Sequence, residues 1–194
     1  MELKTHTLVF ASANAHKVEE VNGKLPWTII GLEEINCHDD IPETAPDLRG
    51  NAAQKARFIY EKYGVDCFAD DTGLEIDALD GKPGVFSARY AGPQKNPLDN
   101  REKVLQEMQT ALHRSARFKT VICCILKGEE FFFEGIAEGS ITREPRGTAG
   151  FGYDPIFVPL GNSRTFAQMS LEEKNIISHR GKAIAQLSAF LKSR

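Results

Sequence analysis

Two neighbouring segments rich in β-branched and aromatic residues constrain the fold more than any other feature of the chain. They run from Phe118 to Ile125 and from Phe131 to Ile141. Side chains of these kinds favour the pleated, half-buried surface of a strand. Lys127-Gly128-Glu129 lies between the two segments and has the composition of a turn. The pattern therefore predicts a long β-hairpin.

Helical periodicity elsewhere makes the predicted fold a mixed α/β one. A buried strand is expected at Thr7–Ala11, followed by a turn from Ser12 to Lys17, and a short strand is expected at Asp66–Ala69. Ser170 and Glu173 have the spacing of a capping box and predict a helix start. Helices are expected where apolar residues recur at intervals of three and four: Val18, Val21 and Leu25; Ala52, Ala56, Ile59 and Tyr63 within residues 50–63; Leu98, Leu105, Met108 and Leu112; and Ala183, Ile184, Leu187, Phe190 and Leu191.

The composition limits the class of protein. A chain of 194 residues with 41% hydrophobic content is long enough to bury a core, and we expect residues 1–194 to form a single domain. A net charge of −3 speaks against a nucleic-acid polymer as partner, because such binding requires a surplus of Lys and Arg. No apolar run approaches the length of about 18 residues that indicates a membrane span, and the first six residues lack the apolar run of a signal peptide. A cytoplasmic protein is expected.

The four cysteines do not suggest chemistry. Cys123 and Cys124 are adjacent within an apolar run, and neither they nor Cys37 and Cys67 form a C-x-x-C pair. That spacing fits buried free thiols better than a zinc site or a disulfide framework.

The segment Ser12-Ala13-Asn14-Ala15-His16-Lys17 places a hydroxyl, an amide and an ammonium in the expected strand-to-helix turn. The backbone N–H groups at the start of a helix favour an anion there, and phosphate is the natural guest. The alternative is that Ser12 or Asn14 only caps the helix while Lys17 is solvated. The segment alone does not choose between the two.

The acidic segment Asp70-Asp71-Thr72-Gly73 follows an apolar strand, where adjacent carboxylates are costly unless cations or donors compensate them. Glu43 is a further carboxylate that could join them. Oxygen ligands of this kind suit Mg²⁺, and one carboxylate could orient or deprotonate an attacking water. The alternative is an Asp-rich turn closed by Gly73, with Glu43 a loop carboxylate.

Two further segments have a functional and a structural interpretation. Gly150-Phe151-Gly152-Tyr153-Asp154-Pro155 is too rich in Gly and Pro for regular structure, and Phe151 could stack on a base. The alternative places Phe151 and Tyr153 in the core and Asp154 in a turn. Lys174 and Ser178-His179-Arg180 form either a donor-rich wall on one face of a continuous helix or a solvated basic patch. Lys55, off the apolar face of its helix, is either a phosphate clamp or a surface lysine.

The order of these segments along the chain carries more information than any one of them. They are Ser12-x-Asn14-x-x-Lys17; Asn51-Ala52-x-x-Lys55-Ala56; Ala69-Asp70-Asp71-Thr72-Gly73-Leu74, continuing to Pro83-Gly84-Val85-Phe86-Ser87-Ala88-Arg89-Tyr90; and Gly150-Phe151-Gly152-Tyr153-Asp154-Pro155, followed by Lys174 and Ser178-His179-Arg180. In this order they resemble the inosine triphosphate pyrophosphatase family, which hydrolyses non-standard purine nucleoside triphosphates. The resemblance spans nearly the whole chain.

The resemblance implies an elongated, two-lobed α/β fold with a long mixed central sheet, flanking helices and a substrate cleft between the lobes, and a homodimer. It implies a Mg²⁺-dependent hydrolase with Glu43 and Asp71 as metal ligands and Asp71 as the base that prepares water. Arg49-Gly50 departs from the family pattern, in which an acid often precedes Asn51. The substrate-binding residues it implies are Ser12, Ala13, Asn14, Ala15, His16, Lys17, Lys55, Thr72, Phe151, Gly152, Tyr153, Asp154, Lys174, His179 and Arg180.

From the implied activity we expect ITP, dITP and XTP to be cleaved to the monophosphate and pyrophosphate. Donors from His179 and Arg180 would favour a 6-keto purine over adenine. Two other functions stay open: a pyrophosphatase for other modified nucleotides, such as methylated pyrimidine triphosphates, and a nucleotide-binding sensor that has lost turnover, for which Arg49-Gly50 is the only hint.

Overall fold

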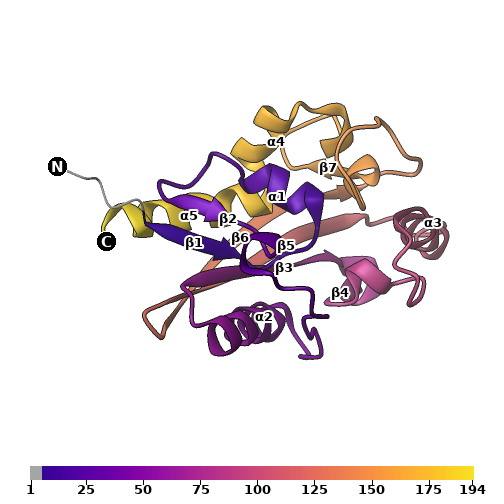
Figure 1. Cartoon of the computed structure of the whole chain (residues 1–194). Coiled ribbons are helices and arrows are strands. Elements are labelled where there is room, and N and C mark those ends of the chain that lie inside the picture. Colours follow the sequence, from indigo (N-terminus) through magenta and orange to yellow (C-terminus); the bar gives the residue numbers. More distant parts are fainter. Residues whose placement is uncertain (1–5) are drawn as a thin grey trace. The chain divides into compact units, whose positions relative to one another are not determined.

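The computed structural model describes residues 6–194 (Figure 1). Within these residues the chain forms two compact units. Unit 1 contains the described residues up to Asp71 together with Val121–Glu134 and Ala183–Arg194, and unit 2 contains Thr72–Thr120 and Gly135–Lys182. The strands are β1 (Thr7–Phe10), β2 (Thr28–Ile30), β3 (Cys67–Ile76), β4 (Pro83–Gly84), β5 (Ser115–Leu126), β6 (Glu129–Ile141) and β7 (Phe157–Pro159). The α-helices are α1 (Ala15–Val21), α2 (Leu48–Tyr63), α3 (Pro97–Glu107), α4 (Leu171–Ile177) and α5 (His179–Lys192). The expected mixed α/β class is confirmed.

In unit 1 a parallel β2-β1-β3 arrangement is covered by helices on both faces. Val9 of β1 pairs with Ile30 of β2 and with Cys67 of β3. The helix α2 lies on one face and α1 on the other (Figure 1). The α1 face holds the main apolar cluster of this unit, in which Phe10 stacks on Phe68 with ring centroids 4.5 Å apart. This cluster also contains Leu8, Val21, Ile122, Cys124, Leu126, Ala183, Ile184, Leu187 and Leu191.

The strands β5 and β6 form the expected hairpin. Only Lys127 and Gly128 separate them, with φ angles of 50° and 86°. Two consecutive residues with positive φ are typical of the tight hairpin turn whose twist matches that of the strands, and Gly adopts this conformation at no steric cost. Both strands are long enough to belong to unit 1 near the turn and to unit 2 at their other ends.

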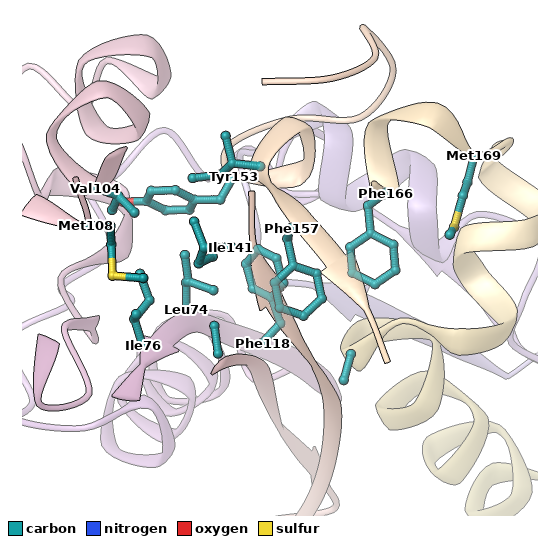
Figure 2. Close-up of a cluster of buried hydrophobic side chains, with 13 residues drawn as sticks. Leu74, Ile76, Val104, Met108, Phe118, Ile141, Tyr153, Phe157, Phe166 and Met169 are labelled. Carbon is teal, nitrogen blue, oxygen red and sulfur yellow. The ribbon is translucent and has the colours of Figure 1, made fainter. Parts of the chain in front are cut away.

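The core of unit 2 combines aliphatic side chains with aromatic rings (Figure 2). Phe157 packs against Phe118 at 4.7 Å and against Phe166 at 5.2 Å between ring centroids. The helix α3, capped by Asn96, contributes Val104, and Met108 follows the helix. Both are fully buried.

Several sequence-based expectations about helices are wrong in detail. Leu98 and Leu112 are 56% and 87% exposed, so they do not belong to the buried face of α3. The helix α1 begins at Ala15 and ends at Val21, so the turn after β1 is shorter than expected and Leu25 lies beyond the helix. Val18 is 40% exposed. Short amphipathic stretches give few periodic positions, and so the period alone located these helices but not their faces or ends.

The acidic segment is a strand and not a turn. The strand β3 continues from Cys67 through the carboxylates to Ile76, well past the expected end at Ala69. Asp and Gly are unfavourable in strands by composition. Here, however, Phe68 pairs with β1 and Leu74 pairs with Gly84 of β4, so the pairing on each side of the acidic residues extends the strand through them.

The last helical region is two helices, which corrects the expectation of a continuous one. The helix α4 starts with the predicted capping box between Ser170 and Glu173. Ser178, with φ −73° and ψ 158°, ends α4, and α5 begins at the next residue. Gly181 permits this close junction, because a Cβ atom there would lie 1.8 Å from the carbonyl oxygen of Asn175.

The four cysteines are buried free thiols, as expected. Burial raises the pKa of the Cys67 and Cys123 thiols to about 12, which keeps both protonated. No helix within residues 6–194 is both long and apolar enough to cross a membrane.

Candidate functional site

The strand β3 directs its two adjacent carboxylates to opposite faces of the sheet in unit 1. Successive side chains of a strand alternate in direction. Asp70 pairs with Lys17 of α1, its Oδ1 atom 3.0 Å from the lysine Nζ. Asp71 points to the side of α2, where its Oδ2 atom accepts a hydrogen bond from Asn51 Nδ2 at 3.0 Å. The two aspartates are therefore 2% and 9% exposed but have different partners.

The loop before α1 is held by its own side chains. Asn14 Oδ1 accepts hydrogen bonds from the backbone N–H groups of His16 and Lys17, at 3.1 and 3.3 Å, and caps the helix. Ser12 Oγ accepts from the backbone N–H of Asn14. Ala13, Asn14, Ala15 and His16 are exposed. The capping role of Asn14 is thus confirmed, whereas the solvated Lys17 of that alternative is wrong because its side chain is 14% exposed and paired with Asp70.

Lys55 brings Glu43 and Asp71 together. Its ammonium forms an ion pair with Glu43 Oε1 and lies 3.8 Å from Asp71 Oδ1. The Lys55 side chain is only 8% exposed, so the interpretation as a surface lysine is wrong. The helix α2 places Lys55 one turn after Asn51, and both side chains approach β3 from the same helix. Buried lysines occur almost only where carboxylates compensate them.

The charges of this group influence one another. Burial lowers the pKa of Lys55, but the carboxylates of Asp71, Asp70 and Glu43 together raise it above its ordinary value, so the ammonium stays charged. Burial raises the pKa of Asp71, and the neighbouring Lys55 and Lys17 counteract only part of this rise. The group combines a proton-accepting carboxylate with fixed cations, which suits the binding and activation of a polyphosphate.

Unit 2 holds a second group, built around the ring of Phe151. Lys174 Nζ lies 5.1 Å and Arg180 Cζ lies 5.7 Å from the centroid of this ring. The Lys174 ammonium also forms an ion pair of 2.7 Å with Asp154 Oδ2, and both side chains are 4% exposed. The interpretation of Lys174, His179 and Arg180 as a solvated patch is wrong, since all three are buried.

Asp154 also fixes the loop that carries Phe151. Its Oδ2 atom accepts a hydrogen bond of 2.9 Å from the backbone N–H of Phe151. Gly150 precedes the ring with a φ of 71°, and a Cβ atom there would lie 2.1 Å from Asp154 Oδ2. Gly152 also has a positive φ. The close approach of the backbone to a buried carboxylate therefore explains Gly150, and the left-handed backbone conformation explains Gly152.

Tyr153 fits the structural interpretation of this segment. It is 5% exposed, belongs to the aromatic core and donates its hydroxyl hydrogen to the carbonyl oxygen of Ser87 at 2.8 Å (Figure 2). Asp154 begins a single 3₁₀ turn, Asp154–Ile156, so this segment is not wholly irregular. Phe151, by contrast, is only partly buried and lies outside the core cluster.

Thr72 and Arg180 form a polar network in unit 2. Arg180 Nη2 donates to Thr72 Oγ1 at 2.9 Å, and Thr72 Oγ1 lies 2.6 Å from Thr120 Oγ1. Arg180 is 1% exposed. His179, 3% exposed, stacks on Phe118 with ring centroids 4.5 Å apart.

The predicted residues thus gather in two groups. The Lys55 group of unit 1 comprises residues 12–17, Glu43, Lys55 and Asp71, and the ring group of unit 2 comprises Thr72, residues 151–154, Lys174, His179 and Arg180. Asn51 and Thr120 were given no role from sequence, although Asn51 stands in one of the motifs. Arg49 stacks on Phe132, 3.5 Å from its ring centroid, which accounts for a basic residue at this position.

Comparison with known proteins finds relatives that match nearly the whole chain. The chain is 57% identical over 182 residues to the dITP/XTP pyrophosphatase of Flavobacterium johnsoniae, covering 93% of this chain and 95% of that one. It is 52% identical over 189 residues to the dITP/XTP pyrophosphatase of Porphyromonas gingivalis, covering 95% and 96%.

Solved structures agree with the sequence comparison. The Ham1 protein of Staphylococcus aureus has a TM-score of 0.89 at 38% identity, and that of Coxiella burnetii has a TM-score of 0.89 at 40% identity. In each case 97% of this chain and 99% of the other are covered. The model of the Ham1 family matches residues 8–190. The resemblance found in the sequence is therefore confirmed, and the chain belongs to the Ham1 family.

Proposed function

We propose that this chain is a pyrophosphatase that hydrolyses non-standard purine nucleoside triphosphates, with dITP and XTP as substrates and the nucleoside monophosphate and pyrophosphate as products. The relatives at 57% and 52% identity are dITP/XTP pyrophosphatases. The observation that carries the mechanism is the grouping of Asp71 and Glu43 with the buried Lys55. This grouping provides a carboxylate that can accept a proton from water and an ammonium that can bind phosphate.

In this proposal the Lys55 group of unit 1 binds the triphosphate of the substrate. Lys17 and Lys55 supply positive charge on the two faces of β3, and each is already held in place by a carboxylate. Ser12 and Asn14 add hydroxyl and amide groups in the loop before Lys17. Phosphoryl and nucleotidyl transfer depend chiefly on such positioning and charge neutralisation.

Glu43 and Asp71 fit a magnesium site that substrate completes. Both are oxygen donors, and both approach the Lys55 ammonium. Residues 6–194 include no group of three or more His, Cys, Asp or Glu side chains suited to a metal ion. Two carboxylates are what Mg²⁺ usually takes from a protein in phosphate chemistry, because it keeps several waters and binds substrate phosphates. When bound, the ion would neutralise charge on the phosphate oxygens.

The chemical step proposed is attack of water on the α-phosphorus. Asp71 accepts a proton from the water while the water oxygen forms the new bond to the α-phosphorus. The bond from the α-phosphorus to the α,β-bridging oxygen breaks. That oxygen leaves as part of pyrophosphate, and the nucleoside monophosphate remains. Burial of Asp71 supports this role, because it raises the pKa of the carboxyl and makes it a better proton acceptor.

The ring group binds the base. Asp154 accepts a hydrogen bond from the backbone of Phe151 and so fixes the position of its ring, near which Lys174 and Arg180 also lie. Stacking on an aromatic ring is tolerant of base identity, so selectivity requires hydrogen bonds. Arg180 and His179 supply donors that favour a 6-keto oxygen over the 6-amino group of adenine.

The test is a pyrophosphate-release panel across dITP, ITP, XTP, GTP, ATP, dTTP and a methylated pyrimidine triphosphate, with and without Mg²⁺. We expect fast release from dITP, ITP and XTP only when Mg²⁺ is present. Single phosphate without pyrophosphate would refute the cleaved bond, and equal turnover of ATP and ITP would refute the base-reading role of His179 and Arg180. Preference for methylated pyrimidine triphosphates would favour a pyrophosphatase for other modified nucleotides. Nucleotide binding without any release of pyrophosphate would favour the nucleotide-binding sensor.

We propose further that the protein acts as a homodimer, as its family resemblance implies, and that it removes non-standard nucleotides from the pool of the cytoplasm. Light scattering of the purified protein should give twice the 21.5 kDa mass of the chain. A mass equal to that of one chain at micromolar concentration would refute the dimer. Fractionation of the producing cell tests the compartment.

A further inference from the structure

We infer that Asn51 is a positioning residue that fixes the orientation of the Asp71 carboxylate and ties it to the loop that carries Glu43. The inference rests on the proposed function, since it concerns how the carboxylate that accepts the proton is held. Asn51 lies in the first part of α2, is 1% exposed, and is on the same helix as Lys55, four residues earlier.

The two hydrogen bonds of the Asn51 side chain determine its orientation. Its Nδ2 group donates to Asp71 Oδ2 at 3.0 Å, and its Oδ1 atom accepts from the backbone N–H of Ala45 at 2.9 Å. If the amide were flipped, its oxygen would face a carboxylate and its NH₂ group would face another donor. Only one orientation therefore satisfies both partners.

This contact restricts the motion that matters most for a proton acceptor. The terminal torsion of an aspartate is broad, because rotation of the flat carboxylate meets only a low barrier. The bond from Asn51 holds Oδ2, and Oδ1 is then the oxygen 3.8 Å from Lys55 Nζ. The two carboxylate oxygens consequently have different neighbours: an amide for one and an ammonium for the other.

The second bond connects Asp71 to Glu43 through the backbone. Ala45 is two residues after Glu43, so the Asn51 amide holds the loop and the carboxylate at once. The same loop has another attachment to α2: the backbone N–H of Thr44 donates to Gln54 Oε1 at 2.9 Å, and Gln54 Nε2 donates to Thr44 Oγ1 at 2.9 Å. Gln54 and Asn51 thus both attach this loop to α2, whereas the hydrogen bond to Asp71 comes from Asn51.

This difference supplies the experiment. Asn51→Asp keeps an acceptor for the Ala45 N–H but replaces the donor to Asp71 by a second carboxylate. Gln54→Ala loosens the loop and leaves the donor to Asp71 intact. We expect Asn51→Asp to lower kcat for dITP about 10- to 100-fold, as loss of an outer-shell partner of a ligating carboxylate typically does. We expect Gln54→Ala to change kcat less than about threefold, and KM to stay within about twofold in both variants, because neither residue is proposed to contact substrate.

A structural measurement gives a readout that does not depend on turnover. Crystal structures of the two variants should show the Asp71 carboxylate rotated in Asn51→Asp and unchanged in Gln54→Ala. If Asn51→Asp does not fold, Asn51→Ala replaces it in both measurements with the same expectation. An unmoved Asp71, an unchanged kcat, or an equal loss of kcat in the Asn51 and Gln54 variants would overturn the positioning role.

The two proposals fail in different ways. If the wild-type protein releases no pyrophosphate from dITP, the proposed function is refuted, and the rotation of Asp71 in the variant structures still decides whether Asn51 positions it. If the wild-type protein is active but the Asn51 variants match it, the function stands and the positioning role is refuted.

Discussion

The Lys55 group of unit 1 and the ring group of unit 2 both contain a buried lysine, but the lysine has different surroundings in each. Lys55 has an ion pair with Glu43, lies 3.8 Å from Asp71 and has its pKa raised by three carboxylates. Lys174 forms an ion pair with Asp154 and lies 5.1 Å from the ring of Phe151 and 5.7 Å from that of Phe166.

The difference teaches what each group can do. Several carboxylates around one ammonium leave a surplus of negative charge that a metal ion and a proton can share, which suits chemistry. The ion pair of Lys174 with Asp154 has no net charge and lies beside an aromatic ring, which suits binding of a flat, uncharged base. The comparison therefore predicts that variants of unit 1 act on turnover, whereas those of unit 2 act on binding and stability.

The largest effect is expected from Asp71→Asn. The variant has nearly the same shape but cannot accept the proton from water, and so kcat for dITP should fall about 10²- to 10⁴-fold. Pyrophosphate release under saturating substrate measures it. Asp80→Asn is the matched control: Asp80 is exposed and has a φ of 52°, which Asn adopts readily, so its activity should equal that of wild type. Equal activity of Asp71→Asn and wild type would remove Asp71 from catalysis.

A large loss of stability is expected from Lys174→Met. The substitution leaves the Asp154 carboxylate buried without its ammonium, and breaking such a pair costs about 3–5 kcal/mol of unfolding free energy. Urea unfolding measures this loss. Arg164→Met is the control, because the Arg164–Glu173 pair is about half exposed and screened by solvent, so its loss should lower the stability much less. Similar losses in both variants would contradict the contrast between buried and exposed pairs.

A smaller effect, on binding, is expected from Phe151→Ala. Loss of a stacked aromatic ring costs about 1–3 kcal/mol, which corresponds to a rise in the KM for dITP of about 5- to 150-fold. Steady-state kinetics separate this rise from a change in kcat. Phe151→Tyr keeps the ring face and serves as the control. A loss confined to kcat would show that the ring group does more than bind the base.

The smallest effect is expected from Ser170→Ala. Ser170 caps α4, which carries Lys174, and its Oγ accepts from the backbone N–H of Glu173 at 3.1 Å. Removing a cap of this kind costs about 0.5–2 kcal/mol. Thermal unfolding measures it, with the exposed Ser193→Ala as the control. Because Ser170 is not proposed to contact substrate, KM should not change, and a raised KM would mean that α4 needs its cap to place Lys174.

The fold elements predicted correctly are those specified by local chemistry. The hairpin turn at Lys127 and Gly128 and the capping box at Ser170 depend on residues that are neighbours in sequence. The course of β3 through Asp70 and Asp71 was not predicted, because it depends on pairing with β1 and β4, which are distant in the chain. The break at Ser178 was missed because helical spacing continues across it.

The candidate site residues were chosen by their order along the chain, which does not reveal their environments in the fold. By local sequence alone Lys55 and Arg180 could be solvent-exposed basic residues. Both are buried, because they have partners on other elements. Asn51 received no role for the same reason: an amide reveals its function only when the carboxylate it bonds is known. Whether residues 1–194 form a single domain stays a prediction.

The strand β3 has a consequence for how this chain can change over evolutionary time. Asp70 and Asp71 are adjacent and face opposite ways, and Thr72 follows them in the other unit. A one-residue insertion or deletion in a strand turns every later side chain to the other face. Loss of one codon upstream in β3 would therefore exchange the partners of both aspartates. Substitutions can be tried singly in this strand, but changes of length cannot.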